Sequence, residues 1–194
     1  IAIITYVCFG IGRSIWLDEA NSILIAAKSY PGLIDGLAKD GNPPVYYFIL
    51  KAVMTLGGRS EIAVRLPSVL AYLCGIAAVY RLASLRYDRD VCFLSAAFFA
   101  MSPVAGRQGQ NARMFTLLAL ITSVSTISFF RIENADTRTR RSLALHGAIA
   151  ALGLFTHYWF CFVLLAQALW IAWHWKEWAI RDLCLLAAFS CLPF

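Results

Sequence analysis

The chain has 194 residues, of which 60% are hydrophobic and 14% are charged. This is more apolar than an ordinary soluble domain, so the composition predicts a membrane protein with several spans. The formal net charge is +6. The basic residues stand in short loops between apolar runs, which indicates positive-inside topology and excludes a nucleic-acid-binding face. All six cysteines lie in apolar segments, a pattern that favours free thiols over a disulfide framework.

The apolar runs at the two ends of the chain are incomplete. Residues 1–12 are fewer than the roughly 20 that a transmembrane helix needs, and residues 191–194 stop inside another apolar run. We therefore expect a fragment of a longer protein, truncated at both ends.

Two adjacent carboxylates, Asp18 and Glu19, follow the first apolar run. Carboxylates at the edge of a membrane are costly and therefore usually functional. The alternative is structural, since Asp18 can cap a surface helix that has Glu19 in its first turn. The residues alone leave both interpretations open.

A polar stretch of about residues 18–61 forms the first expected loop outside the membrane. Apolar spacing over residues 21–40 predicts two short amphipathic helices, broken at Pro31 and Gly32. A third helix over residues 43–57 is short for a crossing, which takes roughly 17 to 25 residues. We expect it to be a juxtamembrane element.

The rest of the chain reads as membrane spans. Residues 62–82 are long enough for one span, and the later apolar runs carry polar turns at residues 106–113 and 156–158. Two crossings separate each basic loop from the next, so these polar turns fall on the opposite, outer side. The sequence therefore predicts an all-α, polytopic transmembrane bundle whose polar clusters converge on one face.

Six short motifs occur in order: SIWLDEA at 14–20, NPPVYY at 42–47, SEIAVRLPS at 60–68, SP at 102–103, QNARMF at 110–115 and THY at 156–158. This series resembles the GT-C glycosyltransferases, in the branch that holds the protein O-mannosyltransferases and the bacterial aminoarabinose transferases of lipid A. The resemblance implies that residues 1–194 form one GT-C catalytic module, from the amino-terminal half of a longer enzyme.

The resemblance also implies an activity. Such an enzyme moves a sugar from a polyprenyl-phosphate donor to a lipid, glycan or protein acceptor, here expected at the periplasmic face of a bacterial inner membrane. A sugar on phosphate already has a good leaving group, so transfer needs a base for the acceptor and cations or donors for the departing phosphate. By resemblance Asp18 is the catalytic base, while Glu19 is a metal ligand, an acceptor contact or a loop hydrogen-bond partner.

Further polar residues are candidates for substrate binding. A guanidinium forks onto phosphate oxygens, so Arg113 is the preferred phosphate ligand, with Gln110 three residues earlier on the same face of an expected helix start. The alternative is an interfacial arginine that snorkels to water. His157 and Tyr158 form part of a motif, although a lone histidine at a helix turn is often a simple hydrogen-bonding group.

Asn42 and Asn111 are also candidates for substrate binding, although both depart from the family pattern. The family often has His or a Glu-Lys pair near Asn42, which can also cap the following helix, and often has Glu at the position of Asn111. These departures remove the side chains that would suggest a metal or phosphate role at the two positions, so the resemblance assigns no ligands to a divalent metal ion as cofactor. The asparagines also motivate a rival hypothesis, a non-catalytic GT-C subunit of a membrane complex; a transporter is a third alternative.

Three other features have simpler interpretations. Arg65 is expected to anchor the turn at Glu61, with donor binding as the second role, and Arg107 shares the ambiguity of an interfacial arginine. The acidic residues within 88–90 match a metal-binding pattern but lie among arginines, so we interpret them as charge balance in a loop.

Overall fold

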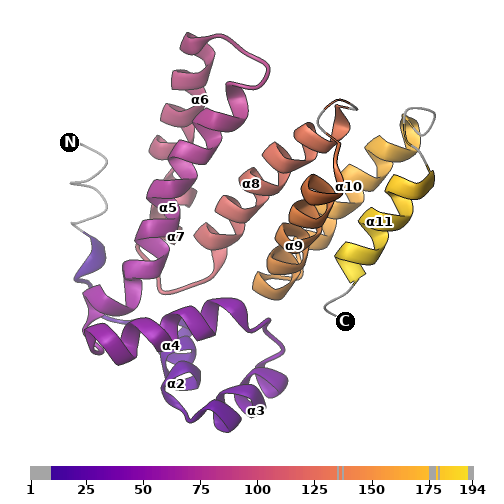
Figure 1. The fold of residues 1–194 in the computed structure, drawn as a ribbon. Helices are drawn as coiled ribbons and strands as arrows, with labels where there is room; N and C mark the ends of the chain where they lie inside the picture. Colours follow the sequence, from indigo (N-terminus) through magenta and orange to yellow (C-terminus); the bar gives the residue numbers. More distant parts are fainter. Residues whose placement is uncertain (1–9, 135, 137, 175–177, 179, 192–194) are drawn as a thin grey trace.

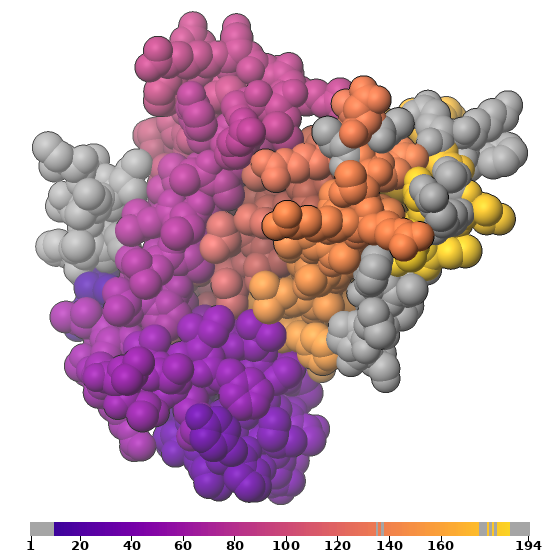
Figure 2. Space-filling view, viewed as in Figure 1, coloured from indigo at the N-terminus to yellow at the C-terminus, as the bar shows by residue number. Residues whose placement is uncertain are grey.

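The computed structural model describes residues 10–134, 136, 138–174, 178 and 180–191. Throughout this described part the regular structure is helical, which confirms the predicted all-α fold. Figure 1 shows two parts: a bundle made by α5 to α11, and a layer of α2, α3 and α4 across one end of it. Figure 2 shows the same layer as a continuous surface at that end.

The layer consists of three short helices, α2 (Leu17–Ala27), α3 (Tyr30–Asp40) and α4 (Val45–Gly57). In Figure 1, α4 runs across the end of the bundle, as expected for a juxtamembrane helix. The two predicted amphipathic helices are present, but the predicted break is wrong. The chain breaks before α3, where the Ser29 hydroxyl accepts a hydrogen bond from Gly32 N at 3.4 Å. Pro31 lies in the first turn, where a missing N–H costs no helical hydrogen bond.

The described part of the bundle consists of α5 (Glu61–Ala83), α6 (Arg89–Met101), α7 (Pro103–Gly109), α8 (Phe115–Glu133), α9 (Arg140–Thr156), α10 (Phe160–Trp173) and α11 (Ile180–Cys191). Among the described residues, α5 and α8 are long and apolar enough to cross a membrane. The apolar run after residue 90 is split because Ser102 ends α6 and caps α7, its hydroxyl accepting from Ala105 N at 3.4 Å. The predicted turn at 106–113 is consequently shorter, since α7 continues to Gly109.

Hydrogen bonds fix the turn between α7 and α8 against two other helices. The Ser68 hydroxyl of α5 donates to the Arg113 carbonyl at 2.9 Å and lies 2.9 Å from the Tyr46 hydroxyl of α4. Thr116 Oγ1 donates to the Ser68 carbonyl at 2.9 Å. Gly109 allows the turn to approach α5, because a Cβ there would lie 3.1 Å from the Tyr72 ring. The backbone that carries Arg113 is therefore held in place.

The other end of the bundle carries the basic loops. Arg86 Nη2 forms an ion pair with Glu133 Oε2 at 2.9 Å, joining the loop after α5 to the end of α8. The Asp88 carboxylate caps α6 by accepting from Val91 N at 3.3 Å, which agrees with a structural interpretation of residues 88–90. Cys74, Cys92, Cys161 and Cys184 are free, as predicted; the side chains of Cys8 and Cys191 lie outside the described residues.

Candidate active site at the layer end of the bundle

Glu19 is the buried centre of the region where the layer meets the bundle. Its side chain is 0% exposed. Arg65 donates from Nε to Oε1 at 2.8 Å and from Nη2 to Oε2 at 2.7 Å. Backbone N–H groups complete the set, from Ala112 to Oε1 at 2.8 Å and from Trp16 to Oε2 at 3.3 Å. Both oxygens therefore accept two hydrogen bonds each, which matches the capacity of a carboxylate.

The net effect of these contacts is to stabilise the charged carboxylate. Burial by itself raises the pKa of Glu19, but the Arg65 guanidinium and the Ala112 N–H outweigh it and lower the pKa below 4.5. Glu19 was expected as a substrate-binding residue, a metal ligand or a loop hydrogen-bond partner. Its contacts match the last of these, because they join α2, α5 and the turn before α8.

Arg65 is the cation of this buried pair, and its other donors hold the chain that leads into α2. Nη1 donates to the carbonyls of Ile11 at 2.7 Å and Arg13 at 2.6 Å, and Nη2 donates to Ser14 O at 3.2 Å. The prediction that Arg65 anchors the Glu61 turn is wrong. The sequence did not reveal its partner, because Glu19 and Arg65 are 46 residues apart.

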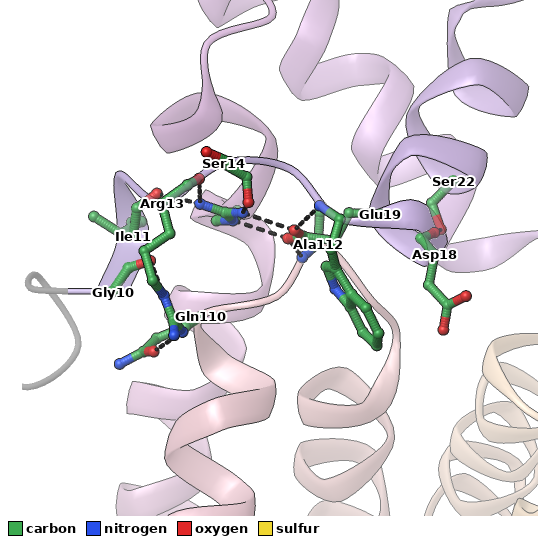
Figure 3. Close-up of polar contacts among 11 residues, drawn as sticks. Gly10, Ile11, Arg13, Ser14, Asp18, Glu19, Ser22, Gln110 and Ala112 are labelled. Atoms are coloured by element: carbon green, nitrogen blue, oxygen red, sulfur yellow. Dashed lines mark hydrogen bonds and ion pairs between the residues drawn. The ribbon is translucent and has the colours of Figure 1, made fainter.

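Asp18 lies beside Glu19 in the first turn of α2 but faces the opposite way (Figure 3). Its side chain is 51% exposed, and Oδ2 lies 3.4 Å from Arg113 Nη1. Asp18 is not the cap of α2, since the cap position belongs to Trp16. The purely capping alternative is thereby excluded, and the structure brings together the two residues that the sequence proposed as base and phosphate ligand.

Arg113 and Gln110 do not face one cavity. Residues 110–114 form a non-helical turn before α8, so the three-residue helical spacing does not apply to them. Arg113 points to Asp18, with its side chain 18% exposed. Its Nε is buried and has no hydrogen-bond partner within the described structure. Gln110 is buried and accepts from Arg13 Nη2 at 2.7 Å, on the far side of Glu19 from Asp18 (Figure 3).

Asp40 is a residue of this face that sequence reasoning missed. Its carboxylate accepts from Asn42 Nδ2 at 2.5 Å, Asn21 Nδ2 at 2.9 Å and the Tyr47 hydroxyl at 3.2 Å. Burial raises the pKa of Asp40, but these three donors and nearby Arg113 lower it overall. One signal was available: Asp40 ends α3, where the helix dipole disfavours a negative charge.

The turn between α9 and α10 completes the face. His157 Nδ1 accepts a hydrogen bond from Trp159 N at 3.1 Å, so the proton of the neutral ring is on Nε2. Burial lowers the pKa of His157, and the charge of Arg113 lowers it further. The Tyr158 hydroxyl donates to the Gly41 carbonyl, which ties this turn to the end of α3. Both residues therefore lie where the sequence placed them, on the same end as Asp18.

The two asparagines have different surroundings. Asn42 lies on the face of Asp18 through its bond to Asp40. Asn111 is buried and lines a polar cavity with Arg13 and Arg107. Within the described parts of the chain no group of three or more His, Cys, Asp or Glu side chains could hold a metal ion.

An apolar cavity of about 470 Å³ adjoins this face. It lies between the end of α3, the start of α4 and the end of α9, and Asn42 and Tyr158 form part of its wall. Its other lining residues are Ile34, Leu37, Ala38, Gly41, Pro43, Pro44, Leu154 and Phe155. The polar cluster around Asp18 and this apolar cavity thus lie side by side at one end of the bundle.

These features define an all-helical membrane protein with a charged cluster at one end of its bundle. The sequence model of the dolichyl-phosphate-mannose-protein mannosyltransferases matches residues 41–194, which is most of the chain, and the protein belongs to this family. Membership makes it a membrane glycosyltransferase of the GT-C type. The match contains Arg113, His157 and Tyr158, whereas Asp18 lies upstream of it. Comparisons with curated proteins and with solved structures gave no match.

Proposed function

We propose that this glycosyltransferase takes a sugar from a polyprenyl-phosphate donor and transfers it to a lipid, glycan or protein acceptor, with Asp18 as the general base. The observation that carries the proposal is the pairing of an exposed carboxylate with a mostly buried guanidinium, Asp18 with Arg113 at 3.4 Å. Membership of the mannosyltransferase family supports the donor class.

The Asp18–Arg113 pair can serve both substrates, with Arg113 binding the donor phosphate and Asp18 binding the acceptor. The donor phosphate competes with Asp18 for the Arg113 guanidinium, whose Nε has no other partner in the described structure. Once Arg113 turns to the phosphate, the Asp18 carboxylate is free to accept a hydrogen bond from the acceptor. His157, which carries its proton on Nε2, supplies a further neutral donor at this end of the bundle.

The proposed transfer is a single displacement at the anomeric carbon. The acceptor oxygen forms a bond to that carbon while its proton passes to the Asp18 carboxylate. The bond between the anomeric carbon and the phosphate oxygen breaks, and its electron pair leaves with the polyprenyl phosphate. One base and one leaving group on opposite faces of the sugar invert its configuration.

Asp18 suits the base role better than its neighbours. Glu19 is inaccessible behind Arg65, and the Asp40 carboxylate already accepts three hydrogen bonds. The apolar cavity beside Asn42 and Tyr158 is suited to the first isoprene units of the donor. The proposed face therefore offers a base, a phosphate ligand and a surface for the chain of the lipid.

Sugar transfer by an Asp18→Asn variant tests this function. We expect the rate, per folded molecule in membranes supplied with a polyprenyl-phosphate sugar, to fall roughly 10²- to 10⁴-fold, the range for loss of a general base. Asp35→Asn is the matched control, because Asp35 is an exposed acid on α3 that forms its ion pair with Lys39, away from Asp18. Full activity of Asp18→Asn would exclude Asp18 as the base.

A further inference from the structure

The polar cavity that Asn111 lines lies on the other side of Glu19 from Asp18. Its volume is about 220 Å³, and its lining residues are Arg13, Ser14, Trp16, Glu19, Arg65, Arg107 and Asn111. It is therefore formed by the segment before α2, by the first turn of α2, by α5, and by α7 with the turn that follows it. The proposed transfer reaction does not use this cavity.

The lining of this cavity carries a net positive charge. Glu19 and Arg65 form a closed pair and cancel each other. Arg13 and Arg107 then contribute two further positive charges, and no other carboxylate is in the lining. The Arg107 guanidinium makes no ion pair or hydrogen bond with any part of the chain that the structure describes. An anion would thus meet two guanidinium groups without displacing an acidic partner from either.

Arg13 is held in place toward the cavity. Its Nη2 donates to Gln110 Oε1 at 2.7 Å, and its Nε donates to Gly10 O at 3.3 Å. Gly10 leaves room for this contact: a Cβ there would lie 2.0 Å from Gln110 Oε1, so the Gln110 side chain would have to move. Figure 3 shows Gly10, Arg13 and Gln110 gathered on this side. Gln110 does not contact Asp18; its role in this cavity is to position the Arg13 guanidinium.

We propose that this cavity binds a phosphate group, either free or as the head of a lipid. Two guanidinium groups, the Ser14 hydroxyl and the Asn111 amide offer donors for a tetrahedral oxyanion. The volume is below the roughly 300 to 1,000 Å³ of sites for whole drug-sized ligands, so it suits a headgroup. Trp16, 49% exposed at the cavity, is a residue type that favours membrane interfaces.

The inference does not depend on the proposed transfer reaction, because Arg113 lies on the opposite side of the Glu19 pair. Binding is best measured in the Arg113→Gln background, where the proposed donor site contributes least. The full-length protein in neutral lipid nanodiscs is titrated with inorganic phosphate and, separately, with short-chain phosphatidic acid. The rise in melting temperature with each probe gives its dissociation constant.

We expect saturable binding that weakens roughly tenfold or more in Arg107→Gln, the scale of one lost charge-assisted hydrogen bond. Arg107 is exposed and unpaired within the described structure, so this variant should melt like its parent without ligand. Gly10→Ala should also weaken binding, because it moves Gln110 away from Arg13. Arg59→Gln, which removes an exposed arginine outside the cavity, should leave binding unchanged.

The two probes separate the sources of the phosphate. Binding of both supports a site open to free phosphate, and binding of phosphatidic acid alone supports a lipid headgroup. The proposal is overturned if neither probe binds, or if binding persists in the Arg13→Gln, Arg107→Gln double variant. Loss of transfer in Asp18→Asn has no bearing on these outcomes, so the two proposals fail independently.

Discussion

The closed region around Glu19 and the open face around Asp18 put adjacent carboxylates into opposite environments. Glu19 is 0% exposed and accepts from Arg65, Ala112 and Trp16. Asp18 is 51% exposed and has one guanidinium beside it at 3.4 Å. This difference indicates that the buried contacts of Glu19 determine the positions of Asp18 and Arg113 on the open face. Glu19 adjoins Asp18 in α2 and binds Ala112, the neighbour of Arg113, so it fixes both members of the Asp18 pair.

Replacing Glu19 by Gln should have the largest effect on stability. Removal of one member of a buried pair leaves Arg65 charged without its partner, which costs about 3 to 5 kcal/mol. We expect a correspondingly lower free energy of unfolding, measured by denaturant titration in detergent, while the exposed Asp18→Asn changes it by less than about 1 kcal/mol. Equal stability of the two variants would contradict the distinction between the regions.

Replacing Arg113 by Gln should affect the open face. Loss of a charge-assisted contact to the donor phosphate costs about 1.5 to 3 kcal/mol, so binding of the donor should weaken about 10- to 150-fold. Titration with a polyprenyl phosphate measures this. Arg59→Gln is the control, and unchanged donor affinity in Arg113→Gln would remove Arg113 as the phosphate ligand.

Acid should weaken the closed region. The folded-state pKa of Glu19 is lowered from 4.5, so its contribution to stability is fully present above pH 4.5 and is lost as the pH falls through the folded pKa. Melting temperatures measured between pH 7 and pH 3 should therefore decline less steeply in Glu19→Gln than in the wild type. Parallel declines in the two proteins would show that Glu19 does not carry this dependence.

The smallest expected effect concerns the contact between Tyr158, in the turn between α9 and α10, and Gly41, at the end of α3. Tyr158→Phe removes the hydroxyl that donates to the Gly41 carbonyl, and an exposed neutral hydrogen bond contributes about 1 kcal/mol. A melting temperature lower by a few degrees should accompany this loss, with Tyr87→Phe, an exposed tyrosine outside the layer, as the control. A larger loss in the control variant would argue against a specific role for the Tyr158 contact.

The helices could be predicted from the sequence because apolar spacing is a local signal. The grouping of the polar clusters at one end could be predicted by counting the membrane crossings between the basic loops. Asp18, Arg113 and His157 were found through motifs, and the structure places them at one end of the bundle. The partner of Arg65 was not predictable, since it depends on how α2 packs on α5. The sequence also did not predict that the side chains of Gln110 and Arg113 point to different sides of Glu19. The reason is that a non-helical turn replaces the expected helix start.

The most direct test of the division between the two carboxylates is a density map of the full-length protein with a bound polyprenyl phosphate. The account predicts the phosphate within hydrogen-bonding distance of Arg113, on the side of Asp18, with the Glu19–Arg65 pair intact. A phosphate bound to Arg65 with Glu19 displaced would contradict it.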